Sequence, residues 1–417
     1  MKLCLTLLFS AFLAGLIYAQ ENWPRFRGVD GRGVSEAKLP EEIGKQNLRW
    51  SVPLPGPGSS SPVIWGDALF VTGEDRKKGK VSLTCLDAMS GKKRWAKSLD
   101  VGGYHLHRFN NTAAASPAVN EDMVVVCWYS AKKESAMMSA YDHEGNRLWV
   151  HEIGSGKTQH GLNIQPEIHG DKILVCHLHM NVGYVGAVGV KDGKSIWKTE
   201  FPGGKTSYVT PLVRELPDGG KEVVVASQSI GVVGLDLKDG KVRWEVPGSM
   251  KQRTIVSPIN VLAGSNSKDV QIAVGCKSGV YFTVRPPVKA GGEAKIVWRM
   301  KGNTPYVPTP VSDGKMFYSV SDGGVLVALD ASSGEKKWEE KLMANFYASP
   351  LIVGGRLICL SREGELIVAE IGASYKEISR NSLELGEAIE WSDVTPAVAH
   401  DRLYVRIGAR LDCFGEK

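Results

Sequence analysis

The 417-residue sequence predicts an all-β fold, an eight-bladed β-propeller of four-stranded antiparallel blades closed by an N-terminal strand. Three observations predict it. One short phrase recurs along the chain, a second marker recurs at a steady interval, and the two ends of the chain carry complementary parts of one blade. Together these observations indicate the type of strand connection, the number of blades and the way the ring closes.

The recurring phrase places a glycine four residues before a tryptophan. The glycine supplies the positive φ of a tight hairpin, and the tryptophan begins the fourth strand of a blade. Its indole is large enough to fill the wedge against the neighbouring blade, so we expect a structural role for it and for Asp87, Asp236 and Asp330 in the turns. The phrase occupies residues 86–95, 141–149, 189–197, 235–244 and 329–338.

The second marker is a small polar residue or Gln followed by proline, and it counts the blades. The markers recur on average about every 48 residues, an interval typical of propeller blades. Short alternating apolar runs follow each one, which indicates strands, and proline is tolerated where a strand begins. The eight markers are Ser61-Pro62, Ser116-Pro117, Gln165-Pro166, Thr210-Pro211, Ser257-Pro258, Thr309-Pro310, Ser349-Pro350 and Thr395-Pro396.

The ends of the chain predict how the ring closes. Residues 395–414 supply three strands and then stop, whereas residues 48–54 form a lone fourth strand that contains Trp50. We expect the two to pair, because a closed ring leaves no unpaired sheet edges. Two blades depart from the pattern: the fifth carries an insertion at 285–298, and the seventh lacks the tryptophan.

The first residues predict export from the cytoplasm. Lys2 precedes an apolar run over residues 3–17, and the pattern is that of a signal peptide cleaved after about Ala19. An uncleaved anchor is the alternative. Residue 16 is Leu where a lipoprotein would need Cys, so no lipid anchor is expected. The predicted organisation is a signal peptide (1–19), an N-terminal extension (20–47) and a propeller (48–417) of a secreted or periplasmic protein.

Composition narrows the classes of partner and cofactor. The net charge of +6 is mild, and no basic run interleaved with aromatics appears, so nucleic acid is not an expected partner. Six cysteines remain beyond the signal, none adjacent to another, and each lies in an apolar run. We therefore expect buried free thiols and neither a disulfide framework nor a cysteine metal site.

The repeats over residues 48–417 resemble the quinoprotein-like (PQQ-like) repeat family, named for the pyrroloquinoline quinone dehydrogenases and including the outer-membrane assembly lipoprotein BamB. Residues 23–35, WPRFRGVDGRGVS, further resemble the WPxFRGPxGxG opening of secreted PQQ-like repeat proteins common in planctomycetes. The resemblance implies the propeller fold. It says little about function, because the repeat motif builds the outside of the blades.

Loops just ahead of the markers are expected to open at one mouth of the central channel. They mix amides, aromatics and cations, which suits stacking and hydrogen bonding of a polar ligand, although loop residues are polar in any case. The candidate ligand-binding residues are His105, His107, Asn163, Tyr208, Tyr306, Tyr347 and Trp391.

Histidines at the same mouth suggest a metal site as a further hypothesis. His105 with His107, and His177 with His179, are two HxH pairs, and residues i and i+2 of a strand face the same side. Together with His160, these imidazoles suit Zn, Cu or Fe. The candidate metal ligands are His105, His107, His160 and His179, against the alternative that such pairs arise by chance.

An enzymatic role is the rival interpretation. In the dehydrogenases that the family is named for, the resemblance implies a vicinal disulfide, a stacked Trp, a Ca²⁺ held by Glu and Asn, and an Asp base. This chain has no adjacent cysteines, and Glu390 and Asp393 beside Trp391 are one acidic cluster among eight loops. We therefore expect no PQQ or Ca²⁺ and a monomeric, non-catalytic scaffold for a protein or small polar ligand. The alternative is a PQQ- or metal-dependent oxidoreductase.

Overall fold

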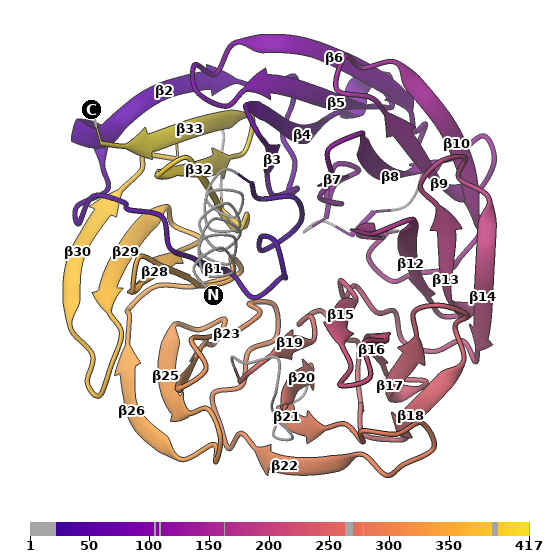
Figure 1. Ribbon diagram of the computed structural model, residues 1–417. Coiled ribbons are helices and arrows are strands. Elements are labelled where there is room, and N and C mark those ends of the chain that lie inside the picture. The colour runs from indigo at the N-terminus through magenta and orange to yellow at the C-terminus, as the bar shows by residue number, and fades with distance from the viewer. Residues whose placement is uncertain are drawn as a thin grey trace, which may run out of the picture.

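The computed structural model describes residues 22–103, 106–107, 110–161, 163–262, 270–277, 279–385 and 391–416. These residues form eight β-sheets arranged in a ring, which confirms the predicted all-β propeller (Figure 1). The helical segments among them are two single 3₁₀ turns, η1 (Lys45–Asn47) and η2 (Arg76–Lys78). In this part of the chain there is no helix long and apolar enough to span a membrane.

Each blade runs from an inner strand near the axis to an outer strand at the rim, and each inner strand begins one residue after a marker proline. Blade one is β3 (Val63–Trp65), β4 (Ala68–Asp75), β5 (Lys80–Asp87) and β6 (Lys93–Asp100). Blade two is β7 (Ala118–Val119), β8 (Val124–Ser130), β9 (Ser135–Tyr141) and β10 (Arg147–Gly154). Blade three is β11 (Glu167–His169), β12 (Lys172–Leu178), β13 (Gly183–Gly189) and β14 (Ser195–Phe201). Blade four is β15 (Leu212–Glu215), β16 (Lys221–Ser227), β17 (Gly231–Asp236) and β18 (Val242–Val246).

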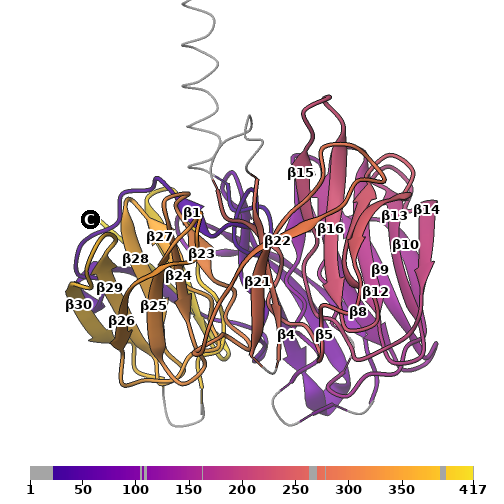
Figure 2. The ribbon, with the colours of Figure 1, turned by 90° about the horizontal axis from the view of Figure 1, so that it is seen from below.

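The second half of the ring repeats this arrangement, with strands running between the two faces of the ring (Figure 2). Blade five is β19 (Ile259–Asn260), β20 (Ile272–Cys276), β21 (Val280–Arg285) and β22 (Lys295–Arg299). Blade six is β23 (Val311–Ser312), β24 (Met316–Val320), β25 (Val325–Asp330) and β26 (Lys336–Lys341). Blade seven is β27 (Leu351–Val353), β28 (Arg356–Leu360), β29 (Glu365–Glu370) and β30 (Glu377–Ser382). Blade eight takes β31 (Ala397–Ala399), β32 (Arg402–Ile407) and β33 (Arg410–Gly415) from the C-terminus.

Blade eight is completed by the N-terminal strand β2 (Leu48–Pro53), as predicted. This strand pairs antiparallel with β33, with Trp50 opposite Cys413 and Val52 opposite Leu411. The ring is therefore closed by hydrogen bonds between strands from the two ends of the chain, and its last sheet has four strands.

The glycine and tryptophan of the recurring phrase meet across neighbouring blades. The indole of Trp95 lies against Gly145 of the next blade and donates to the carbonyl of His143 over 2.7 Å. A Cβ at Gly145 would lie 2.8 Å from the Trp95 ring, so this position needs glycine for space as well as for its φ of +85°. The same contact joins Trp197 to Gly240 and Trp298 to Gly334. The structural role predicted for the phrase is confirmed.

The cysteines of the propeller pack inside the blades. Cys85, Cys127, Cys176, Cys276, Cys359 and Cys413 are all buried and free of disulfides, as expected. Burial raises the pKa of the Cys359 thiol to about 12, so it stays protonated and packs as a small apolar group.

The described part of the predicted N-terminal extension crosses the centre of the ring (Figure 1, indigo). Trp23 exchanges backbone hydrogen bonds with Ile64 of blade one. The Arg25 side chain forms a buried ion pair with Glu167 of blade three. Further along this segment, strand β1 (Val34–Ser35) pairs in parallel with β27 of blade seven. We call residues 22–35 the N-terminal plug, since they connect blades on opposite sides of the axis.

Arg27 is the central contact of the N-terminal plug. Its side chain is 1% exposed, and burial lowers its pKa to about 9, which leaves it charged at neutral pH. The guanidinium donates to five backbone carbonyls, and no carboxylate of the described residues forms an ion pair with it. The acceptors are the carbonyls of Gly31, Arg32, Thr309, Pro310 and Pro350.

Candidate functional site

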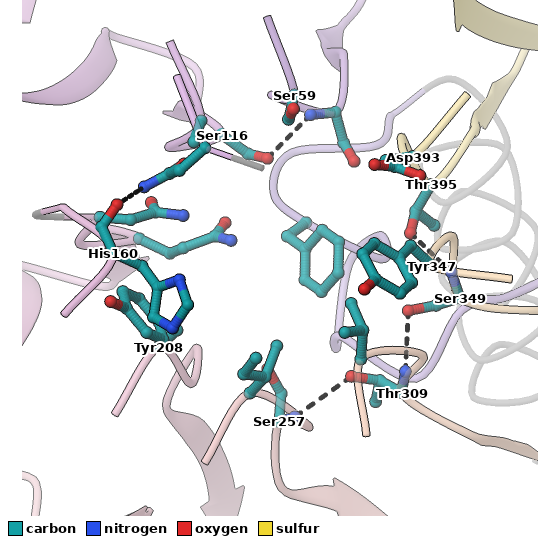
Figure 3. A pocket seen from close by; sticks show the side chains of 18 of the residues that line it. Ser59, Ser116, His160, Tyr208, Ser257, Thr309, Tyr347, Ser349, Asp393 and Thr395 are labelled. Carbon is teal, nitrogen blue, oxygen red and sulfur yellow. Dashed lines mark hydrogen bonds between the residues drawn. The ribbon is translucent and has the colours of Figure 1, made fainter. Parts of the chain in front are cut away.

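A cavity of about 460 Å³ occupies the centre of the ring, within the size range of small-ligand sites. All eight blades contribute to its wall through the segments before their inner strands, and Phe26 of the N-terminal plug also lines it. The cavity is therefore bounded by the blades around the axis and by the plug (Figure 3).

The structure brings most of the sequence-predicted mouth residues together. His107, Asn163, Tyr208, Tyr306 and Tyr347 all line the cavity, and so does His160. Trp391 is not a lining residue; the centroid of its ring lies 4.4 Å from the guanidinium of Arg362. His105 lies outside the described residues. The lining residues could be predicted because each one stands ahead of a marker proline, and that position lies near the axis of the ring in every blade.

His107 and His160 form one side of the cavity, with ring centroids 4.3 Å apart. The Asn110 amide donates to the carbonyl of His160 over 2.6 Å and so holds that loop in place. Burial lowers the pKa of His160 to about 4, and the nearby Arg253, His107 and Lys277 act in the same direction. The His160 imidazole is therefore neutral at physiological pH.

The second histidine pair lies elsewhere. His177 and His179 are buried with perpendicular rings whose centroids are 4.5 Å apart, and neither lines the cavity. Burial holds the pKa of His179 well below its usual value. In the described ranges, no three His, Cys, Asp or Glu side chains are grouped as a metal site would require. The four-histidine metal set stays a prediction, with His179 away from the cavity lining.

Sequence reasoning missed two cations in the cavity wall. Arg253 precedes the marker of blade five, and Lys277 follows β20 of the same blade. Both lie over the ring of Tyr306, with the Arg253 Cζ 6.0 Å and the Lys277 Nζ 5.2 Å from its centroid. The Arg253 guanidinium also contacts the Nε2 of His160. The signal for Arg253 was present, since it belongs to a loop ahead of a marker, whereas Lys277 lies in the loop between the second and third strands of its blade.

On the opposite side of the cavity, an arginine that is not itself a lining residue contacts two aromatic rings and a lining carboxylate. The Arg362 guanidinium lies 4.0 Å from the centroid of Tyr347 and 4.4 Å from that of Trp391. It donates to both carboxylate oxygens of Asp393, over 2.6 and 3.0 Å. Asp393 is the only carboxylate among the described lining residues, and this bidentate contact neutralises it. Glu390, named with it from the sequence, lies outside the described residues.

The residues before the marker prolines form hydrogen bonds between neighbouring blades around much of the axis. The backbone N–H of one marker donates to the side-chain hydroxyl of the next, as in Ser257 to Thr309 over 3.1 Å and Thr309 to Ser349 over 3.0 Å (Figure 3). In the sequence these residues indicated only the number of blades. Their hydrogen bonds could not be predicted, because a bond between two blades leaves no local sequence pattern. We call the five accepting residues the hydroxyl collar: Ser116, Ser257, Thr309, Ser349 and Thr395.

A valine at Thr309 tests the hydroxyl collar. The change keeps the shape of the side chain but leaves the buried N–H of Ser257 without its acceptor, so we expect the free energy of unfolding to fall by about 1–3 kcal/mol. Thr210→Val is the matched control, because the buried hydroxyl of Thr210 has no partner in the described structure. Urea unfolding should show no loss for this control. Equal losses in both variants would contradict the collar.

Comparison with known proteins places the chain beside two groups of propellers. A family model described as outer membrane protein assembly factor BamB matches residues 41–213, 187–279 and 288–411. The BamB protein of Moranella endobia is 22% identical over 244 residues, which cover 54% of this chain and 59% of that protein. BamB of Yersinia pestis is 22% identical over 270 residues, covering 54% of this chain and 67% of that protein. The match thus spans about three fifths of these relatives.

Solved structures of both groups share the fold. BamB from Moraxella catarrhalis superposes with a TM-score of 0.61 at 16% identity, covering 89% of this chain and 97% of that one. A europium-containing methanol dehydrogenase gives a TM-score of 0.66 at 13% identity, covering 95% and 92%. The quinohemoprotein alcohol dehydrogenase of Comamonas testosteroni gives 0.64 at 13%, covering 98% and 82%. At such identities the likeness is one of fold alone.

Proposed function

The chain belongs to the family described as outer membrane protein assembly factor BamB, and from this premise we propose that it is a non-catalytic, monomeric propeller that binds a protein or small ligand at its central cavity. The observation that carries the proposal is the cavity itself, which residues from all eight blades and the N-terminal plug surround. The name of the curated relatives describes an assembly factor, and assembly requires binding of partners.

We also propose that it works outside the cytoplasm, in the periplasm or as a secreted protein. The apolar run after Lys2 supports this, as does the outer-membrane setting in the name of the relatives. The six buried free cysteines do not depend on a reducing compartment, because burial keeps such thiols protonated and away from oxidants.

The second candidate function is a PQQ-dependent oxidoreductase, which the two dehydrogenases of the same fold favour. The residues present do not fit that cofactor. No cysteine of the described chain lines the cavity, so the vicinal disulfide has no counterpart there. A Ca²⁺ site needs several oxygen ligands, and both oxygens of Asp393, the single lining carboxylate described, are bound to Arg362.

An assay of turnover separates the two functions. The purified protein is incubated with PQQ and Ca²⁺, and separately with Zn²⁺, Cu²⁺ or Fe²⁺, and reduction of an electron-accepting dye by alcohols and aldose sugars is recorded. We expect no turnover in any arm. Substrate-dependent dye reduction that disappears in an Asp393→Asn variant would overturn the proposal and establish the oxidoreductase.

A further inference from the structure

The cavity has a positive side without a matching negative one. Arg253 and Lys277 line it, and no carboxylate of the described residues forms an ion pair with either. Their neighbour His160 is held neutral by burial and by these cations. Asp393 across the cavity is already bound to Arg362. A half-buried arginine beside an exposed lysine, both facing the cavity without a counter-charge, favours an anionic ligand.

Two side-chain amides in the wall have unpaired acceptors. The Oδ1 of Asn163 and the Oε1 of Gln165 are buried and accept no hydrogen bond from the described residues. Gln165 stands where the other markers carry Ser or Thr, so blade three does not continue the hydroxyl collar. Buried acceptors are nearly always paired, so the ligand must bring hydrogen-bond donors as well as negative charge.

The hydroxyl collar adds donors of its own. All five of its side chains line the cavity and accept a backbone N–H, and within the described structure none donates its own proton to a protein acceptor. A hydroxyl that accepts one bond still has a proton to give. The ligand that satisfies these protons carries several acceptor oxygens.

Aromatic rings complete the wall. Tyr208, Tyr306 and Tyr347 line the cavity on three blades, and Phe26 lines it from the N-terminal plug. Flat apolar faces of this kind pack against a ring, while the polar groups between them set its orientation. A linear acid such as a fatty acid would leave the amide acceptors and the collar unpaired.

We propose that the cavity binds an acidic sugar, with its anionic group against Arg253 and Lys277, its hydroxyls against Asn163, Gln165 and the hydroxyl collar, and its ring among the tyrosines. This inference rests on the proposed function and names the class of small ligand. A sugar acid combines the three required properties, because it has a negative group, hydroxyls that donate as well as accept, and a ring. A planar aromatic carboxylate lacks the hydroxyl donors.

Calorimetric titration of the purified protein tests the inference with matched probes. The probes are the dimer of galacturonic acid, the neutral galactose dimer, galactose sulfate, and phthalate as a planar dicarboxylate. We expect the galacturonic acid dimer to bind at least about tenfold more tightly than the galactose dimer, because its carboxylates meet the two cations, and more tightly than phthalate. Its affinity should fall with added salt. Galactose sulfate shows whether a sulfate replaces the carboxylate.

The double variant Arg253→Gln/Lys277→Gln should reduce the preference for the acidic over the neutral sugar to within about threefold. Lys251→Gln is the matched control, because this exposed lysine of the same loop does not line the cavity, and it should keep the full preference. Circular dichroism and urea unfolding of each variant confirm that the ring is intact.

Three results would overturn the inference: no binding of any acidic sugar, equal binding of the acidic and neutral dimers, or a preference that the double variant keeps. Phthalate binding as tightly as the galacturonic acid dimer would overturn the assignment to a sugar. None of these results affects the proposed non-catalytic function, which fails only through turnover in the dye assay.

Discussion

Replacing Arg27 by methionine will lower the free energy of unfolding by about 3–5 kcal/mol. Methionine fills much of the same volume but has no donors, so three buried and two partly buried hydrogen bonds to carbonyls are lost at once. Hydrogen bonds from a charged donor contribute about 1.5–3 kcal/mol each, and the cost of burying the guanidinium offsets part of their sum. Because Thr309, Pro310 and Pro350 belong to blades six and seven, the loss also weakens the attachment of the N-terminal plug to that side of the ring, which then depends on the pairing of β1 with β27.

Urea unfolding measures the change, and trypsin cleavage within the N-terminal plug reports its release. Arg32→Met is the control, because the Arg32 side chain is a partly exposed partner of Asp30 and only its backbone carbonyl contacts Arg27. That control should lose no more than about 0.5 kcal/mol. A loss below about 1 kcal/mol in Arg27→Met, with the plug still resistant to trypsin, would show that Arg27 does not anchor it.

Replacing Arg406 by methionine will destabilise the ring at its closure by a similar amount, about 3–5 kcal/mol. Arg406 lies on β32 of blade eight, is 0% exposed, and burial lowers its pKa to about 9. Its guanidinium donates to the carbonyls of Thr72 and Ser60, to the Ser60 hydroxyl and to the carbonyl of Gly56. These contacts join blade eight to blade one, where the described hydroxyl collar has no bond from Thr395 to Ser61.

The matched control is Arg402→Met on the same strand. The Arg402 side chain also spans the closure, but its bond to the carbonyl of Met89 is exposed, so we expect a loss of no more than about 1 kcal/mol. Hydrogen exchange should show faster opening of β2 and β33 in Arg406→Met, because those strands close the ring. Equal losses in the two variants, or exchange unchanged in β2, would contradict a closure role for Arg406.

The candidate site was only partly accessible from the sequence. His107, His160, Asn163 and the three tyrosines were found because a position ahead of a marker leads to the axis in every blade. Arg253 and Lys277 were missed because a cation in a loop looks the same whether or not a carboxylate lies opposite it. Because Arg362 pairs with Asp393, the charge of this carboxylate is neutralised and is not available to balance Arg253 and Lys277. That pairing joins two blades, and nothing in the local sequence reports it.

What the sequence by itself determined was the ring: the strands, the eight blades and the closure by residues 48–54. The strands and the number of blades follow from patterns within each repeat, and the closure follows from a blade that lacks one strand at the C-terminal end. Such patterns can be read directly from the sequence. Only the tertiary structure decided how the centre is filled. The Arg27 bond to Pro350 spans 323 positions and the Arg406 bond to Gly56 spans 350. Contacts between such distant residues form only when the ring brings eight inner strands to one axis, so they leave no periodic signal in the chain.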